Sequence, residues 1–385
     1  MSSKILNLIN IAALPKDAEK LLDEPISIIK NIDEKDFKAL EQHGIKKIKD
    51  LIQIKDIEKV QKSIDSLSLE KMVTTARIIE NIVRKKTPET GKKLLMAGLD
   101  AAGKTTILRT ILDPLNYKPG DEKPTKGLEF RRWELFGFDK INLWDLGGQK
   151  VYRTEYLADA NTERHFGFTH LFIYVIDIQA EKRYQEAYDY LKRIIEIFHH
   201  LDEEPYCLIL IHKSDPSLDP KKIQKHTQEI IKMIEPLLTV FPKSFHNTSV
   251  YDRGSLFTAF SKGLRDISMV KPVLSGILNI FQKELKSTNT LICNKIGICV
   301  AETGDPNEIL RNFTINVILG EELGIFPGDA SKLILVLKNN SLCIMERIEG
   351  NERFYMAWLS NENPELLMSP PIIKELEPWI LNFLQ

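Results

Sequence analysis

Residues 98–106 read GLDAAGKTT and lie between the apolar run KKLLMAG and the segment ILRTIL. Gly98, Gly103, Lys104 and Thr105 fit G-x-x-x-x-G-K-[ST], whose glycines let backbone N–H groups cradle phosphates while the lysine adds a positive charge. The threonine hydroxyl is a ligand for Mg²⁺, and the dipole of a following helix favours an anion. Because strand, loop and helix follow in the required order, we expect triphosphate binding rather than an ordinary glycine turn. The residues of this phosphate loop are Gly98, Leu99, Asp100, Ala101, Ala102, Gly103, Lys104, Thr105 and Thr106.

A second set of residues has the chemistry to hold a metal and an attacking water. Asp145 ends the run INLWDLGGQ, where a carboxylate beside the phosphate loop holds the magnesium shell, usually through water. In the same run Gly148 lets the backbone approach a γ-phosphate, and Gln149 can orient a water. Thr125, in KPTKG, could complete the shell; the plain alternatives are a capped turn and a solvated threonine. We therefore expect catalysis by Lys104, Thr125 and Gln149, and metal binding by Thr105, Thr125 and Asp145.

The segment IHKSD, residues 211–215, bears on the base. A carboxylate at Asp215 accepts hydrogen bonds from N1–H and N2–H₂ of guanine, whereas adenine would leave it unpaired, which disfavours an ATPase. The stem of Lys213 can lie along the purine, and His212 offers a donor where most guanine-binding proteins have Asn. A further loop, HNTSVYD, could present the backbone N–H groups of Ser249 and Val250 to O6 of guanine.

Length and composition limit the class of protein. The 385 residues suffice for two or three domains, and the apolar fraction of 43% allows sizeable cores. A net charge of −1 argues against a nucleic-acid surface over the whole molecule. The cysteines (Cys207, Cys293, Cys299 and Cys343) lack CxxC spacing and predict buried thiols. The apolar start of the chain is too short to span a bilayer, so we expect a cytoplasmic protein, reaching membranes only through partners.

Three blocks follow one another along the chain. Residues 1–86 predict a small all-α domain, and 87–91 a linker. In residues 92–270, apolar runs alternate with amphipathic helices, which predicts an α/β fold with a mostly parallel sheet covered on both faces. Every motif above then falls in a loop at the carboxyl end of a strand, where ligands bind. Residues 271–385 read helix, two strands, helix, three strands and helix, and we assign them to interaction.

GLDAAGKTT, PTKG and WDLGGQ resemble the nucleotide motifs of Arf-family small GTPases. WDLGGQ, LFIYVID, HKSD and TSVYDRGSLFTAFSK together resemble the Rag/Gtr family, in which HKxD replaces NKxD. The resemblance covers about residues 92–270 and implies a P-loop GTPase domain binding GTP or GDP with Mg²⁺. It implies that Thr125 is the magnesium ligand of the first switch and that Gly148 senses the γ-phosphate. Lys213 and Asp215 would recognise guanine.

The same resemblance implies that 271–385 form an α+β roadblock-like domain that pairs with another such domain. A homodimer and a heterodimer both stay open, and exchange and activating proteins would be the regulatory partners. The Arf-like phosphate loop and the helical block 1–86 depart from the Rag/Gtr pattern.

Two functions follow from these motifs. The first is a switch that hydrolyses GTP slowly, because no arginine can be assigned to the phosphates from the sequence and an arginine finger typically adds about 10³–10⁵ in rate. The second is a nucleotide-binding scaffold with negligible hydrolysis, for which Gln149 and Thr125 would be superfluous.

The N-terminal block resembles a helix-hairpin-helix unit, in the segment IKNIDEKDFKALEQHGIKKIKDLI. Its first hairpin has acids in place of glycines, so we expect a structural or protein-binding role and no nucleic-acid binding. KILNLINIAAL has few cations on its polar face, so we expect it to pack rather than lie in a membrane surface.

Overall fold

The computed structural model describes most of the chain between residues 9 and 360. The described residues are 9, 18–29, 32–54, 57–83, 91–114, 116–117, 119–120, 125–133, 140–268, 271–285, 287–304, 307–322, 324–325, 330, 332–337, 339, 341–348 and 353–360. The final helix that the sequence predicts, and most of the linker 87–91, lie outside these residues. Within the described ranges, no helix combines the length and apolarity that crossing a bilayer requires.

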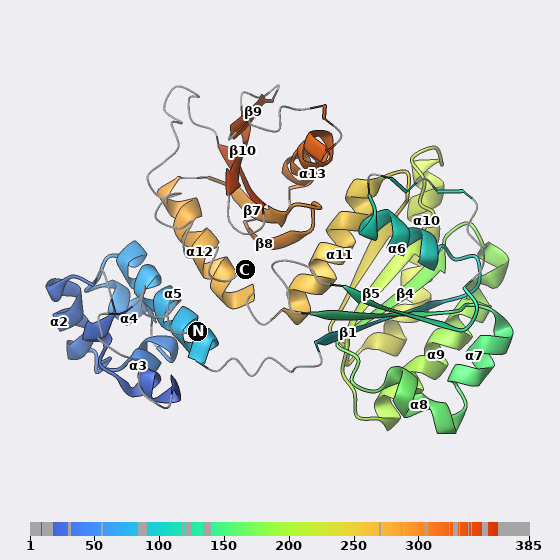
Figure 1. Ribbon diagram of the computed structural model, residues 1–385, viewed down its shortest axis with the longest axis horizontal. Helices are drawn as coiled ribbons and strands as arrows, with labels where there is room; N and C mark the ends of the chain where they lie inside the picture. The colour runs from blue at the N-terminus through green and yellow to red at the C-terminus, as the bar shows by residue number, and fades with distance from the viewer. Residues whose placement is uncertain are drawn as a thin grey trace.

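The central block is built on a six-stranded sheet in the order β2-β3-β1-β4-β5-β6 (Figure 1). Only β2 runs antiparallel to its neighbour, and the other strands are parallel. The strands are β1 (Lys92–Gly98), β2 (Leu128–Trp133), β3 (Ile141–Leu146), β4 (Leu171–Asp177), β5 (Tyr206–His212) and β6 (Lys243–Thr248). The mostly parallel sheet is therefore present as predicted.

Helices cover both faces of this sheet because successive strand residues point to opposite sides. Leu94 and Met96 of β1 pack with α6 and α11, whereas Leu95 and Ala97 pack with α9 and α10. The helices are α6 (Lys104–Leu112), α7 (Lys150–Tyr156), α8 (Asp159–Phe166), α9 (Tyr184–His200), α10 (Pro220–Ile234) and α11 (Arg253–Ile267).

The sequence pattern missed β6, α7 and α8. Strand β6, KSFHNT, is an edge strand with mostly half-exposed residues, so it has no apolar run to mark it. Helices α7 and α8 have seven and eight residues, too few for an apolar period to repeat clearly.

The C-terminal block is a five-stranded antiparallel sheet in the order β8-β7-β11-β10-β9. Helix α12 lies on one face and α13 on the other (Figure 1). Its elements are α12 (Lys271–Glu284), β7 (Asn289–Asn294), β8 (Cys299–Thr303), α13 (Glu308–Glu322), β9 (Lys332–Val336), β10 (Leu342–Ile348) and β11 (Phe354–Ser360). This order of elements matches the prediction as far as β11, and all four cysteines are buried and unpaired.

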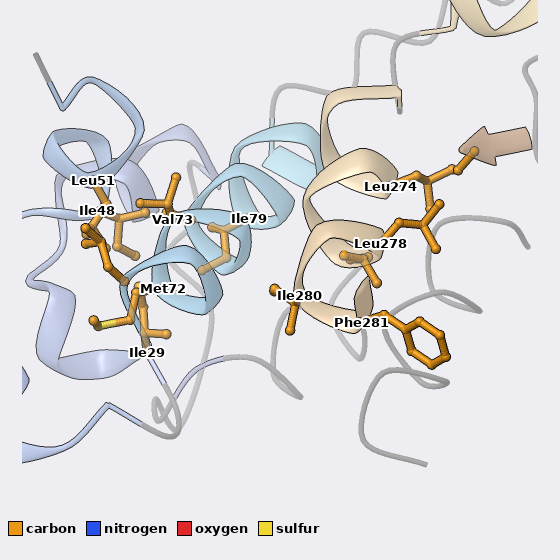
Figure 2. Close-up of a cluster of buried hydrophobic side chains, with 14 of the residues drawn as sticks. Ile29, Ile48, Leu51, Met72, Val73, Ile79, Leu274, Leu278, Ile280 and Phe281 are labelled. Carbon is orange, nitrogen blue, oxygen red and sulfur yellow. The ribbon is translucent and has the colours of Figure 1, made fainter. Parts of the chain in front are cut away.

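The N-terminal block is helical, as expected, and packs on the C-terminal block. Figure 2 shows α5 beside α12, and one apolar cluster runs from Leu51 and Ile79 to Leu278 and Phe281. Its elements are the 3₁₀ turns η1 (Ala18–Asp23) and η2 (Ile26–Ile28), and the helices α2 (Glu34–Gln42), α3 (Ile48–Ile52), α4 (Ile57–Gln61) and α5 (Ser66–Val83). Blocks that are far apart in sequence thus share one core.

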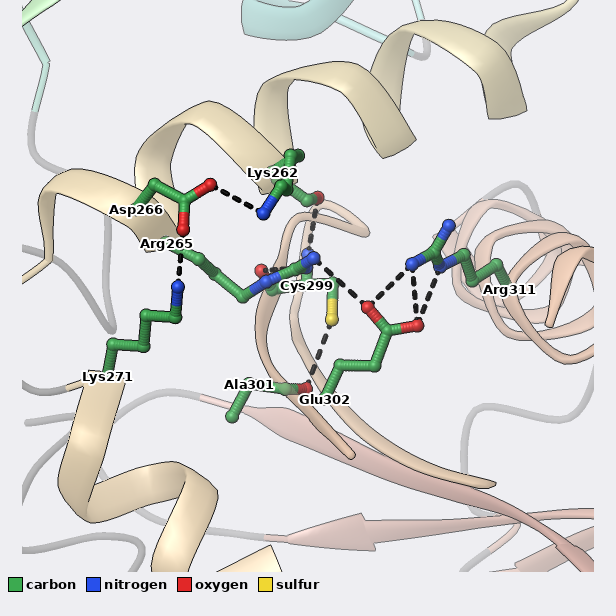
Figure 3. A network of polar contacts seen from close by, with 9 residues as sticks. Lys262, Arg265, Asp266, Lys271, Cys299, Ala301, Glu302 and Arg311 are labelled. Atoms are coloured by element: carbon green, nitrogen blue, oxygen red, sulfur yellow. Dashed lines mark hydrogen bonds and ion pairs between the residues drawn. The ribbon is translucent and has the colours of Figure 1, made fainter. Parts of the chain in front are cut away.

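Helix α11 joins the central sheet to the C-terminal sheet. Arg265 of α11 pairs with Glu302 of β8 at 3.0 Å, and Arg311 of α13 pairs with the same carboxylate at 2.6 Å (Figure 3). These side chains are nearly buried, and a buried charge is costly unless an opposite charge lies close to it. Phe257 of α11 lies in one apolar cluster with Ile298 and Ile315, so the contact combines apolar packing with ion pairs.

Candidate functional site

A cavity of about 410 Å³ opens at the carboxyl ends of the central strands. Its walls come from the loops after β1, β3 and β5 and from the segment before β2. The lining residues are Asp100, Ala101, Gly103, Lys104, Thr105, Thr106, Thr125, Gly148, Gln149 and Lys213. Each of them is a residue that the sequence singled out, so folding brings together motifs that are more than a hundred positions apart.

The phosphate loop wraps the amino end of α6. Gly103 has φ +96°, a left-handed conformation that favours glycine, and a Cβ there would lie 2.6 Å from the ring of His212. The Lys104 ammonium donates to the carbonyls of Gly98 at 3.0 Å and Leu99 at 2.8 Å. Burial lowers the pKa of Lys104 to about 8. A buried cation at the start of a helix suits an anionic ligand, since the ligand would add negative charge beside the ammonium.

Three oxygen-bearing side chains converge beside Lys104, where the sequence predicts a metal. The Thr105 hydroxyl lies 2.7 Å from that of Thr125 and donates to Asp145 Oδ2 at 3.1 Å. The other Asp145 oxygen, Oδ1, is buried without a hydrogen-bond partner. Burial raises the pKa of Asp145 to about 6, against the opposing effect of Lys104. Hard oxygen donors with one unsatisfied carboxylate atom fit Mg²⁺, which usually takes few protein ligands and completes its shell with phosphate and water.

The loop after β3 lies against the phosphate loop. The Asp100 N–H donates to the Gly148 carbonyl at 3.0 Å, and a Cβ on Gly148 would lie 2.3 Å from that nitrogen. Only glycine therefore allows this approach. Gln149 follows as the residue before α7 and reaches the cavity wall.

The loops after β5 and β6 hold the residues expected at the base. Lys213 has φ +62°, and its ammonium pairs with Asp177 at 2.7 Å. Asp215 accepts hydrogen bonds from the Ser249 hydroxyl at 2.6 Å and from the Gln179 amide at 3.2 Å. Because a carboxylate has about four acceptor sites, Asp215 keeps capacity for two further donors.

Comparison with known proteins decides the family. The profile described as the Gtr1/RagA G protein conserved region matches residues 93–314, more than half of the chain. The chain belongs to the Gtr1/RagA family of G proteins. The match continues past the central sheet into α13. Membership supports a GTP-binding small GTPase and identifies the six-stranded block as a P-loop GTPase domain.

The chain is also similar to individual proteins of known sequence or structure. ADP-ribosylation factor-like protein alp41 of Schizosaccharomyces pombe is 31% identical over 147 residues, which are 37% of this chain and 71% of that protein. Ras-related GTP-binding protein C of Mus musculus is 27% identical over 196 residues, which are 49% of this chain and 47% of that protein. The chain thus spans less than half of the mouse relative. The structure of the Arl6 BBS3 small GTPase from Trypanosoma brucei, with bound nucleotide analogue GppNp, aligns with 46% of this chain and 96% of its own at 16% identity, with a TM-score of 0.36.

In this Gtr1/RagA-family chain, His212 does not lie where a donor to guanine was expected. It is buried, and it is not among the residues that line the cavity. Its Nδ1 lies 3.0 Å from the Thr248 hydroxyl, and its ring lies under Gly103. Burial, followed by the Lys213 charge, lowers the pKa of His212 to about 4, so the ring is neutral. His212 therefore supports the loops after β1 and β6 instead of reaching the cavity.

The second base loop also differs in detail. We expected backbone N–H groups of Ser249 and Val250 to face guanine, but the Ser249 N–H donates to the Ser255 hydroxyl at 3.1 Å. The Ser249 side chain bonds Asp215 instead, and Val250 packs against the core of the domain.

Sequence reasoning missed the charged residues at the start of α9. Arg183 pairs with Asp100 of the phosphate loop at 2.7 Å and with Glu186 at 3.0 Å, and Arg153 of α7 pairs with the other Glu186 oxygen. No motif marks Arg183, and the only signal was a cation near the end of β4, the strand beside β1.

We expect acid to destabilise the fold through His212. Between pH 6.5 and about 4 the unfolded chain binds a proton that the folded chain rejects, so the free energy of unfolding falls as pH decreases through this range. His212→Asn keeps a donor and an acceptor but has no titrating group. Between pH 7 and pH 5 its free energy of unfolding should therefore fall by about 1–2 kcal/mol less than that of the wild type.

Urea unfolding at the two pH values measures this difference. The exposed His200→Asn is the matched control and should follow the wild type. An equal loss in the wild type and His212→Asn would contradict a buried neutral imidazole.

Proposed function

We propose that this chain is a Mg²⁺-dependent switch that hydrolyses GTP to GDP and phosphate and dimerises through its C-terminal, roadblock-like domain. The observation that carries the proposal is the convergence of Lys104, Thr105, Thr125, Gln149 and Lys213 on one cavity. Under this proposal the domains are 1–86, 92–270 and 271–385, with 87–91 as a linker.

Each residue has a role that follows from its position. Lys104 and the loop amides would bind the phosphates and stabilise the charge that develops during transfer. Thr105, Thr125 and Asp145 would hold Mg²⁺, which, when bound, neutralises charge on the phosphate oxygens. Gln149 would orient the attacking water, and Asp215 with Lys213 would select and cover guanine.

We expect slow GTP hydrolysis because of the residues that line the cavity. In the part of the chain that the structure describes, no arginine lines the 410 Å³ cavity. Charge on the γ-phosphoryl group would therefore be met mainly by Lys104 and Mg²⁺. A protein that supplies an arginine would accelerate hydrolysis.

The alternative is a scaffold that binds the nucleotide without hydrolysis. Such a scaffold needs Lys104 and the base loops, but it has no use for a water-orienting side chain. Gln149 and Thr125 both line the cavity, which favours the switch.

The dimer proposal rests on the outer edge of β9. This strand pairs with β10 on one side, and no other described strand pairs with it. Ile334, Leu335 and Val336 are 43%, 41% and 60% exposed. An apolar edge strand is a template for pairing with another chain, here a copy of this chain or a relative.

The N-terminal block has a structural role in this proposal. Its helix α5 is buried against α12, which binds it to the C-terminal block. We infer no nucleic-acid partner and no direct insertion into a membrane for this block.

Gln149→Leu should keep nucleotide affinity within about threefold of the wild type and lower single-turnover GTP hydrolysis by about a hundredfold, since it removes only the group that orients water. Gln185→Leu, on exposed α9 surface, is the control and should hydrolyse normally. Unchanged turnover in Gln149→Leu would contradict its role.

Asp215→Asn should weaken GTP binding by about a hundredfold, because a carboxylate that accepts two hydrogen bonds is lost. The same variant should gain affinity for xanthosine triphosphate, since the Asn amide can donate to the carbonyl that replaces the guanine amino group. Competition with ATP, GTP and xanthosine triphosphate measures both effects. The exposed Asp189→Asn is the control, and unchanged base selection would refute guanine reading by Asp215.

Leu335→Asp should weaken self-association by about a hundredfold, because it places a charge in the proposed β9 contact. Sedimentation velocity across a concentration series distinguishes the 44.2 kDa monomer from a dimer. Val240→Asp, at an exposed site on the GTPase domain, is the control. A wild-type dimer that Leu335→Asp leaves intact would place the interface elsewhere.

A further inference from the structure

The phosphate loop carries a negative charge of its own. Asp100 lines the cavity beside Lys104 and Thr105, and it also lines a neighbouring cavity of about 40 Å³. Its N–H bonds the Gly148 carbonyl, so it lies at the end of the cavity where the γ-phosphate sensor is proposed. A carboxylate there repels a triphosphate more than a diphosphate, because the third phosphate adds charge at that end.

Arg183 contacts Asp100 twice, once at the carboxylate and once at the backbone carbonyl. Its Nη2 donates to Asp100 Oδ1 at 2.7 Å, and its Nη1 donates to the Asp100 carbonyl at 3.2 Å. The bond to the carboxylate and the charge of Arg183 keep the pKa of Asp100 below its ordinary value, so the side chain stays ionised. Because the guanidinium is planar and rigid, binding both groups fixes its direction as well as its charge.

The Arg183–Asp100 pair belongs to a network of four charged side chains whose charges sum to zero. Arg183 Nε donates to Glu186 at 3.0 Å, and the second Glu186 oxygen pairs with Arg153 of α7. The order is Asp100, Arg183, Glu186 and Arg153, with alternating signs and a formal sum of zero. Arg153, the last member of this network, is buried and therefore held in place. Loss of the Arg183 charge alone would leave one net negative charge beside the phosphate loop.

We propose that Arg183 is a positioning residue that sets the preference for GTP over GDP by cancelling the charge of Asp100 beside the third phosphate. The inference rests on the proposed nucleotide site. It differs from an arginine finger, since Arg183 acts through Asp100 and need not touch the nucleotide.

The test measures affinities for fluorescent derivatives of GDP and of a non-hydrolysable GTP analogue in the full-length chain. Arg183→Gln should weaken binding of the GTP analogue by about tenfold and binding of GDP by less than about threefold. The reason is that the uncancelled charge of Asp100 acts mainly on the third phosphate. Asp100→Asn should have the opposite effect and raise the preference for the GTP analogue. The double variant, which is neutral again, should return the ratio of the two affinities to within about threefold of the wild type.

Two controls separate charge from structure. Lys182→Gln removes one exposed positive charge next to Arg183 in the sequence and should leave the ratio unchanged. Arg183→Lys keeps the charge and should retain most of the preference. Asp100→Asn leaves Arg183 in place, so its effect is measurable even if Arg183→Gln folds poorly.

The inference is overturned if Arg183→Gln weakens both nucleotides equally, or if the double variant keeps the ratio of Arg183→Gln. A wild-type chain that binds neither nucleotide would instead refute the proposed site itself.

Discussion

A neutral histidine ring packed under a glycine holds the nucleotide loops together. His212 fills the space that a side chain at position 103 would need, and its other edge bonds Thr248. The loops after β1, β5 and β6 are therefore one packed assembly, with an uncharged ring between them. By contrast, the loop after β3 meets this assembly through the backbone bond between Asp100 and Gly148.

Prediction from the sequence worked where one segment contains its own signal. Strands β1, β4 and β5 are mostly apolar runs, buried at all but one residue each, and the phosphate loop is marked by glycines and a lysine at fixed spacing. The polar edge strand β6 and the short helices α7 and α8 lack such a signal, so they were missed. Side-chain partners were harder still, because they depend on which loops meet. Arg183 and Asp100 are 83 positions apart, and His212 was assigned to the nucleotide for its donor although it packs beneath the loop.

Ion pairs recur where separate elements of the structure meet. Arg265, Glu302 and Arg311 join α11 to the C-terminal sheet, as Arg183 and Glu186 join the phosphate loop to α7 and α9. Nearly buried ion pairs such as those of Glu302 add little to stability compared with apolar packing, but breaking one leaves an uncompensated charge. They therefore favour one arrangement of the elements over near alternatives. Asp252, which caps α11, follows Ser249, the partner of Asp215, so the base loop leads directly into the helix that contacts the C-terminal sheet.

The contact between α5 and α12 determines how the GTPase domain is connected to the rest of the protein. Among the described residues, Val83 and Leu274 of this shared core flank the GTPase domain in the sequence, so the whole GTPase domain is an insertion within another folded body. An inserted domain has both ends tethered, and when it unfolds it forms a closed loop with less conformational entropy than a chain with a free end. Local melting of the nucleotide pocket would leave the tethers in place, and the two ends would already be neighbours when the domain refolds.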